Sequence, residues 1–383
     1  NNFINTYEVI VMLQPMFPGI ARASSGLGFG AMRLPTIDGR IDEAEAIRMI
    51  RYAIDHGVRY VDTAYPYHDG ASETLVGKAL KDGYREKVIL ATKLPLWKLQ
   101  KPEDMPAFLD EQLKKLDVDH VDFYLMHAVS EERFNALQQM NYQSFLDKAV
   151  RDGKILYPGF SFHDNADTFL RVLNDYDWKM AQVQMNLLDG DTQATLDGIR
   201  AAGKKGVGVV VMEPLRGGLL ANPPADVQAL YDAFPVKRSA VEWAFRFLYT
   251  MPEVVTILSG MSTMAQVEDN IRIFDAATRE PLTAAEKELY AQVKETYLSR
   301  VKTRCTGCRY CQPCPRGVQI PRIFQGYDGK KLRGQTNYAE EYAKVIADAA
   351  DASRCVKCHK CEAACPQHLP ITRYLAEIDA ECR

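Results

Sequence analysis

The chain has 383 residues, of which 47% are hydrophobic, and its 47 Lys and Arg against 50 Asp and Glu give a formal net charge of −3. This length can bury a large core, and beside a small domain of about 80 residues the remainder suits one big α/β barrel or two ordinary domains. Because the charges nearly balance, no global positive field exists, and we expect neither nucleic acid nor a membrane as a partner.

Residues 1–25 are expected to form an N-terminal extension or a hairpin. The apolar stretch Phe3–Met12 contains Glu8, lacks a basic lead and is followed by Pro15 and Pro18. These features argue against a signal peptide or a membrane span. We therefore expect a cytoplasmic protein.

Short β-branched segments alternate eight times with longer helical patterns over residues 26–283. The alternation predicts a parallel sheet with crossover helices. Eight such units in about 250 residues have the size of a closed (β/α)8 barrel, whose active site lies at the carboxyl ends of the strands. An open doubly wound sheet is the alternative, but the glycines of Gly26-Leu-Gly-Phe-Gly30 do not follow the G-x-G-x-x-G spacing. The predicted strands are Leu27–Met32, Val58–Thr63, Val88–Lys93, Val121–Met126, Ile155–Ser161, Met180–Gln184, Val207–Met212 and Val254–Leu258.

Three segments between and after the strands carry further predictions. A helix over Asp42–His56 would be capped by Asp42 and stopped by Gly57, with one apolar face made of Ala46, Ile47, Ile50, Ala53 and Ile54. The insertion Asn222–Pro235 is either part of a substrate lid or a rigid surface loop. Residues 284–383 should begin with a connecting helix over Ala284–Arg300, and a later helix should bury Tyr338, Tyr342, Val345, Ile346 and Ala349.

Four polar residues fall at successive strand ends of the predicted barrel. Asp62 closes the second strand, Tyr67 lies in the following loop, Lys93 ends the third strand, and His127 follows the fourth. Each alone could be a cap, a rim aromatic, a solvated strand end or a core histidine. Together they predict one catalytic mouth, and Trp97 could either line it or pack beneath it.

All nine cysteines lie beyond residue 300, and eight of them form two runs that each end in Cys-Pro. The second run has the C-x2-C-x2-C-x3-C spacing with which bacterial ferredoxins bind [4Fe–4S] clusters, whereas the first has two residues before its last cysteine. Zinc sites and disulfides are the alternatives, which the dense spacing and the cysteine-free first 300 residues disfavour. We expect two [4Fe–4S] clusters. The predicted ligands are Cys305, Cys308, Cys311 and Cys314 in the first run and Cys355, Cys358, Cys361 and Cys365 in the second.

The ferredoxin rule exchanges the fourth ligands of the two runs. It would give one cluster Cys305, Cys308, Cys311 and Cys365, and the other Cys355, Cys358, Cys361 and Cys314. Cys382 is left over and is expected to be an idle thiol near a frayed terminus. Such clusters favour a reducing, oxygen-poor cell.

Residues 300–335 contain nine Lys or Arg and one acidic residue, Asp328. These charges either offset the negative charge of the clusters or form a docking patch for an acidic, ferredoxin-like electron carrier.

The barrel region resembles the aldo-keto reductases. The resemblance rests on Val61-Asp-Thr-Ala-Tyr-Pro-Tyr67, Gly70-Ala-Ser-Glu73, Ala91-Thr-Lys93 and Leu125-Met-His127. The segments Val211-Met-Glu-Pro-Leu-Arg-Gly217 and Cys305-Thr-Gly-Cys308 make the chain similar to the branch that carries a C-terminal ferredoxin-like domain. The resemblance implies that Tyr67, Asp62, Lys93 and His127 are a catalytic tetrad acting on a small-molecule carbonyl or alcohol substrate.

Reduction of a carbonyl requires these residue types. Hydride addition leaves an alkoxide, so Tyr67 is expected to donate a proton. Lys93 should make the tyrosine more acidic, and Asp62 should keep Lys93 charged and oriented. Neutral His127 would donate a ring N–H to the carbonyl oxygen. The hydride itself must come from a cofactor.

The resemblance also implies NAD(P)H as that cofactor. Ser161 and Gln182 match positions that hold the nicotinamide carboxamide, Met212 replaces the usual stacking aromatic, and Asn270 matches an adenine contact. Gly260 and Gln266 stand where basic residues usually bind the 2′-phosphate, so the choice between NADH and NADPH stays open. The complete set of expected cofactor-binding residues is Ser161, Gln182, Met212, Pro214, Leu215, Gly260, Ser262, Gln266 and Asn270.

Two hypotheses follow. In the first, the chain is a nicotinamide-dependent carbonyl reductase that carries two iron–sulfur clusters. In the second, it is an electron-transfer or redox-sensing module in which the clusters exchange electrons with a ferredoxin-like partner and the barrel is a platform.

Overall fold

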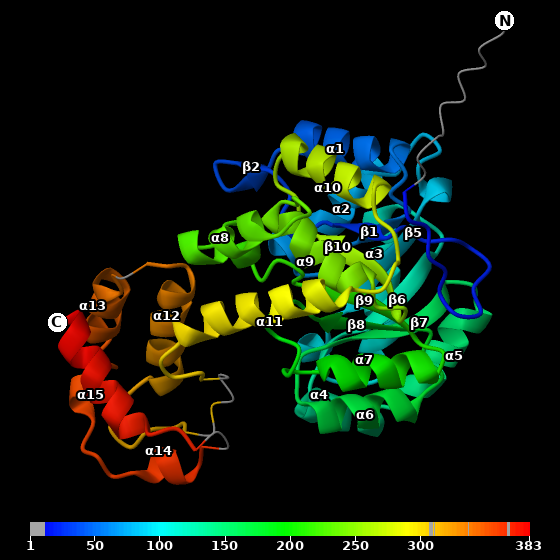
Figure 1. Ribbon diagram of the computed structural model, residues 1–383. Coiled ribbons are helices and arrows are strands. Elements are labelled where there is room, and N and C mark those ends of the chain that lie inside the picture. The colour runs from blue at the N-terminus through cyan, green and yellow to red at the C-terminus, as the bar shows by residue number, and fades with distance from the viewer. Residues whose placement is uncertain (1–11, 306–308, 310, 336, 366–367) are drawn as a thin grey trace, which may run out of the picture. The chain divides into compact units, whose positions relative to one another are not determined.

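The computed structural model describes residues 12–305, 309, 311–335, 337–365 and 368–383. Their contacts divide the chain into two compact units, one of residues 1–216 and 242–282 and one of residues 217–241 and 283–383. The first unit contains the closed barrel of eight parallel strands, which helices surround (Figure 1). The predicted (β/α)8 fold is therefore confirmed.

The barrel strands follow one another around the ring in chain order, and β1 pairs with β10 to close it. Each predicted strand is present, and most ends agree within one or two residues. The strands are β1 (Leu27–Gly30), β4 (Tyr60–Asp62), β5 (Ile89–Leu94), β6 (Val121–Val129), β7 (Ile155–Phe162), β8 (Met180–Gln184), β9 (Gly208–Met212) and β10 (Val254–Ser259), and β2 (Thr36–Ile37) and β3 (Arg40–Ile41) form a separate small hairpin.

The described helices connect the strands on the outside of the barrel. They are α1 (Glu43–Asp55), α2 (Ser72–Ala79), α3 (Asp104–Leu116), α4 (Glu131–Gln139), α5 (Tyr142–Arg151), α6 (Ala166–Asp175), α7 (Thr195–Lys204), α9 (Ala240–Tyr249) and α10 (Met264–Asp275). Helix α1 begins as predicted, because the Asp42 side chain accepts a hydrogen bond from the Glu45 N–H. It ends before Gly57, whose φ of 101° ordinary residues avoid.

Residues 12–25 fold back on themselves ahead of β1. An antiparallel bridge joins Met16 to Ala23, and Ser24 N donates to Pro15 O at 2.9 Å. The turn of this segment inserts Phe17 and Ile20 into the barrel interior. The Phe17 ring lies 4.7 Å from the ring of Phe123. This apolar cluster fills the amino-terminal half of the barrel and leaves the carboxyl ends of the strands for polar groups.

The second unit is helical. It contains α8 (Ala225–Ala233), α11 (Ala284–Ser299), α12 (Ile320–Leu332), α13 (Ala339–Ala347), α14 (Lys360–Ala363) and α15 (Ile371–Cys382). The insertion 222–235 is thus mainly a helix and not a loop, because Val227 and Tyr231 bury one face of α8, which packs against α11. Helix α11 begins with a capping box between Thr283 and Glu286.

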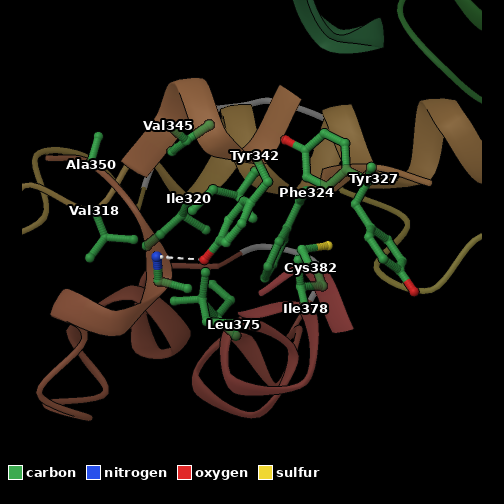
Figure 2. Packing of buried hydrophobic residues seen from close by; sticks show 14 of the residues in the cluster. Val318, Ile320, Phe324, Tyr327, Tyr342, Val345, Ala350, Leu375, Ile378 and Cys382 are labelled. Atoms are coloured by element: carbon green, nitrogen blue, oxygen red, sulfur yellow. Dashed lines mark hydrogen bonds between the residues drawn. The ribbon is translucent and has the colours of Figure 1, made fainter. Parts of the chain in front are cut away.

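The core of the second unit lies between α12, α13 and α15, as Figure 2 shows. Tyr342 donates to Asp379 and accepts from the N–H of Ala352. Ala349, expected on the buried face of α13, lies beyond the helix end in a left-handed conformation and is exposed. Cys382 is buried in this core, so the expected frayed terminus is wrong.

No helix in the described ranges is both long and apolar enough to cross a membrane.

Candidate functional site

Three of the four predicted catalytic side chains are joined by hydrogen bonds at the carboxyl ends of β4 and β5. The Lys93 ammonium donates to Asp62 Oδ1 at 2.6 Å, to Thr63 O at 2.8 Å and to Tyr67 Oη at 3.2 Å. Lys93 and Asp62 are only 1% and 2% exposed. The barrel thus buries an ion pair directly beneath the Tyr67 hydroxyl.

Burial shifts the protonation equilibria of this group. It raises the pKa of Tyr67, and the opposing effect of the Lys93 charge does not cancel that rise. Tyr67 therefore holds its proton at neutral pH, which suits a proton donor but differs from the expected acidification. Burial also opposes the charged form of Lys93, yet contact with Asp62 and Tyr67 raises the Lys93 pKa overall, so its ammonium persists.

His127 lies inside β6 and not after it, because the strand continues to Val129 through an irregular register with β7. Its ring lies 6.2 Å from the Tyr67 ring at 82°, and 5.1 Å from the ring of Trp97. Burial and the nearby Lys93 charge hold the His127 pKa well below its usual value. Its buried Nδ1 has no hydrogen-bond partner among the described residues. A neutral imidazole thus stands beside Tyr67.

A buried polar network that the sequence did not indicate holds the backbone of Lys93. Gln112 donates to Lys93 O at 3.0 Å and to Glu73, and it accepts from Tyr124 at 2.7 Å. Glu73 also accepts from Thr92 at 2.7 Å. The only sequence signal for it was Glu73 at the end of the Gly70-Ala-Ser-Glu73 motif, since Gln112 lies 39 residues away on α3.

The residues expected to hold the nicotinamide lie on neighbouring strands β7, β8 and β9. Gln182 is 2% exposed, its Nε2 approaches Met212 Sδ at 3.8 Å, and its Oε1 has no partner among the described residues. An unpaired buried acceptor suits an amide N–H. Ser161 Oγ accepts from Ala128 N at 2.7 Å, which leaves its O–H to donate to a ligand. This part of the site fits a carboxamide group.

The residues expected around the adenosine end lie between β10 and α10. Gln266 Oε1 accepts from Ser262 N at 2.7 Å, and Asn270 Nδ2 donates to Ser259 at 3.0 Å. Gly260 faces the side chain of Arg33, which a Cβ on Gly260 would meet at 3.2 Å. Arg33, whose guanidinium also lies 3.8 Å from Glu213 Oε1, is thus a cation next to Gly260, where the sequence indicated no basic residue.

The turn after β9 carries the remaining residues that the sequence indicated near the cofactor. Pro214 is buried and Leu215 is half-buried. Arg216, which follows Leu215 in this turn, pairs with the buried Asp189 at 3.1 Å.

Cysteines from both runs line one cavity of about 120 Å³ in the second unit. They are Cys311 and Cys314 from the first run and Cys355, Cys358 and Cys361 from the second. Four of the five form the exchanged ligand set expected for one cluster. Of the other set, Cys365 is buried in the adjoining core, Cys305 packs against that core, and Cys308 lies outside the described residues.

The cysteines that line this cavity are the residue type that binds [4Fe–4S] clusters. Within the described ranges, no three His, Cys, Asp or Glu side chains gather closely enough to hold one metal ion. A [4Fe–4S] cluster spreads four thiolate ligands around a cube of atoms, so a cavity between cysteines is the feature that it requires. Asp328 of α12 fixes the approach to the first run by accepting hydrogen bonds from the N–H groups of Thr303 and Arg304.

The basic residues of the segment 300–335 are largely paired with carboxylates of the same unit. The pairs are Arg300 with Asp226, Lys302 with Glu377, Arg322 with Asp348, Lys330 with Glu341 and Lys331 with Glu381. The cations on the rim of the cysteine cavity are different. Arg316 and Lys360 line the cavity, and within the described part of the chain neither forms an ion pair. Arg354, whose side chain donates to Arg316 O at 3.2 Å, and Lys357, which precedes the cavity-lining Cys358, form none either.

Comparison with family models identifies both parts of the chain. The model of the "Aldo/keto reductase family" matches residues 26–286, and the model of a "4Fe-4S dicluster domain" matches residues 304–370.

Curated relatives and solved structures agree with these matches. The chain is 30% identical to the L-galactose dehydrogenase of Arabidopsis thaliana over 64% of its own length and 83% of that protein. It is 32% identical to the "Probable aldo-keto reductase 1" of Glycine max over 52% of its own length, and spans 58% of that protein. The holo form of aldo-keto reductase AKR11C1 from Bacillus halodurans superposes with a TM-score of 0.63 at 26% identity, over 74% of this chain and 96% of that one.

Proposed function

The chain belongs to the aldo/keto reductase family and carries a C-terminal 4Fe-4S dicluster domain, and from that premise we propose that it is an NAD(P)H-dependent oxidoreductase that reduces an aldehyde or ketone. The observation that carries the proposal is the buried Lys93 ammonium, which bonds to Asp62 and to the Tyr67 hydroxyl at once. Both family matches bear out the resemblance inferred from the sequence motifs.

In this proposal the chain's own residues bind the carbonyl and move its proton. Tyr67 Oη donates a proton to the carbonyl oxygen as the negative charge develops there. Lys93 stabilises the phenolate that remains, and Asp62 keeps the ammonium charged. His127, neutral because of its lowered pKa, orients the carbonyl by donating a ring N–H.

NAD(P)H, when bound, supplies the hydride. Gln182 and Ser161 would hold its carboxamide, and Met212 would lie against the nicotinamide ring. Pro214 and Leu215 would line the same side, while Gly260, Ser262, Gln266 and Asn270 would face the adenosine. A Klebsiella pneumoniae aldo-keto reductase "in complex with NADPH" shares this fold at 23% identity with a TM-score of 0.60, a likeness that concerns the fold alone.

We propose two [4Fe–4S] clusters in the C-terminal unit, with the exchanged ligand sets given above. Support comes from the cavity that Cys314 shares with Cys355, Cys358 and Cys361. The clusters, when bound, would supply one-electron redox chemistry or structural cross-links. Thiolate ligands require a reducing compartment, which supports a cytoplasmic location in an oxygen-poor cell.

The second candidate function is electron exchange with an acidic, ferredoxin-like carrier. It is favoured by two unpaired cations that line the cysteine cavity, Arg316 and Lys360, together with the exposed Val356 of the same lining and the nearby unpaired Arg354 and Lys357. An exposed apolar residue next to positive charges is a fitting contact for an acidic protein. Of these four cations only Arg316 belongs to the segment 300–335 that the sequence indicated, where most of the other cations are already paired.

Anaerobic assays of the purified protein would separate the two candidates. Oxidation of NADH or NADPH should depend on an added aldehyde or ketone, and Tyr67→Phe should abolish it while leaving nicotinamide binding in place. A wild-type protein that reduces no carbonyl in a broad panel, yet exchanges electrons with reduced ferredoxin, would favour the second candidate.

A further inference from the structure

Strand β6 is irregular at the point where it presents His127. Its parallel register with β7 breaks between Met126 and Val129. Ala128, inside this break, has φ of 53°, a left-handed conformation that residues other than glycine rarely adopt. A strand does not take such a conformation at alanine unless surrounding groups hold it there.

Two side chains satisfy the backbone polar groups that Ala128 would otherwise offer to the sheet. Ser161 Oγ of β7 accepts from the Ala128 N–H at 2.7 Å. Arg133 Nη1 donates to Ala128 O, also at 2.7 Å. Ser161 thus holds the peptide that joins His127 to Ala128, and Arg133 holds the next peptide, so that the two bonds fix both sides of the Ala128 Cα.

Arg133 is well placed to hold this peptide. It lies in the first turn of α4, where its N–H meets the capping side chain of Ser130. Its guanidinium lies 5.5 Å from the ring centre of Trp97, which itself contacts the His127 ring. Within the described residues no carboxylate pairs with Arg133. The hydrogen bond to Ala128 O is therefore the polar contact that orients the Arg133 guanidinium, and the Trp97 ring restrains the guanidinium further.

We propose that Arg133 is a positioning residue, which holds Ala128 in its left-handed conformation and so aims the His127 ring at the substrate carbonyl. The inference rests on the proposed function in so far as His127 orients that carbonyl. Arg133 itself need not contact the substrate. Its effect passes through the backbone of Ala128, and this makes a specific genetic rescue possible.

The rescue uses the conformational freedom of glycine. Arg133→Met should lower kcat about 10- to 100-fold, since small misplacements of a catalytic group have effects of this size, while KM for the nicotinamide stays unchanged. Ala128→Gly alone should change kcat little. The double variant Ala128→Gly with Arg133→Met should have a kcat about tenfold higher than that of Arg133→Met alone, because glycine adopts a positive φ without the support of Arg133. Arg133→Lys should retain part of the activity.

Arg171→Met is the matched control. Arg171 also places its guanidinium over an aromatic ring of α4, that of Phe134, and bonds to Glu131 and Asn135, but among the described residues it forms no hydrogen bond or ion pair with β6. This variant should leave kcat unchanged.

A readout that needs no turnover separates this inference from the proposed function. Hydrogen exchange of the Ala128 amide and the ¹⁵N shifts of the His127 ring should change in Arg133→Met and return toward wild type in the double variant. Both measurements remain valid even if the wild type reduces no carbonyl. Absence of rescue, with unchanged Ala128 exchange, would overturn the inference. A rise in KM confined to anionic substrates would instead make Arg133 a substrate-binding residue.

Discussion

Replacement of Lys93 by methionine should destabilise the barrel in a pH-dependent way. Lys93 and Asp62 are almost fully buried and 2.6 Å apart, and removal of one partner from a buried pair costs about 3–5 kcal/mol. Asp62 can limit this cost by taking up a proton. Protonating Asp62 costs about 1.4 kcal/mol for each pH unit above its ordinary pKa of 3.8. The loss of unfolding free energy in Lys93→Met therefore cannot exceed about 4 kcal/mol at pH 7.

The destabilisation of Lys93→Met should increase with pH, because it depends on the protonation of Asp62. Without Lys93, burial raises the folded-state pKa of Asp62 above its unfolded value, so the folded variant binds the extra proton. The penalty is absent below the unfolded pKa and grows as the pH rises. The difference in unfolding free energy between Lys93→Met and wild type should therefore be about 3–4 kcal/mol at pH 7 and less than about 1 kcal/mol near pH 4.

Urea unfolding followed by tryptophan fluorescence would measure this difference, because all three tryptophans, Trp97, Trp178 and Trp243, belong to the barrel unit. The double variant Asp62→Leu with Lys93→Met is the control, since it removes both charges and should regain most of the stability but no activity. Equal destabilisation at both pH values, or a loss below about 1 kcal/mol at pH 7, would refute the reasoning.

Four further predictions address the catalytic and redox sites. Because burial raises the Tyr67 pKa, kcat for carbonyl reduction should stay level from neutral pH to about 10 and fall only above it; a pH profile with an alkaline limb near pH 8 would contradict this. Protein prepared without oxygen should contain about eight iron and eight sulfide per chain, and two zinc ions without sulfide would exclude the clusters. Arg33→Gln should lower the preference for NADPH over NADH if Arg33 takes the role that Gly260 and Gln266 leave open, as the ratio of kcat/KM for the two cofactors would reveal. Reversal of Arg354 and Lys357 to glutamate should weaken binding of a purified acidic ferredoxin and flatten its salt dependence, whereas reversal of the paired Lys330 and Lys331 should do so less.

Local sequence patterns predicted most of the fold. The barrel strands emerged because continuous β-branched segments, bounded by glycine and polar residues, are typical of strands buried on both faces. Helix α1 was predicted because its cap and apolar face lie within 16 residues. Even there, Met49 is buried and Ile47 only half-buried, because the neighbouring elements set the centre of the buried face.

The parts that were missed depend on contacts between distant segments. No local pattern joins Gln112 to Glu73 and Lys93, and none shows that Lys330 and Lys331 are paired with acids 11 and 50 residues away. The sequence predicts a strand end before His127, whereas β6 continues to Val129 through an irregular register that residue types alone do not reveal. The insertion 222–235, expected as part of a lid or as a loop, forms helix α8 because Val227 and Tyr231 pack against α11, a contact that the local sequence does not reveal.

The apolar turn at Phe17 also has a consequence for the order of folding. Phe17 touches rings from β4 and β6, and its ring would collide with any Cβ at Gly208 of β9. The apolar pocket that receives Phe17 therefore exists only once β4, β6 and β9 have come together in the barrel. The last of these strands in the chain, β9, ends at Met212. The segment around Phe17 precedes all of these strands in the chain, so the ribosome makes it before the partners that it needs, and contacts over such sequence separation form late and slowly. The Phe17 turn thus reaches its native place only after β9 has joined the barrel.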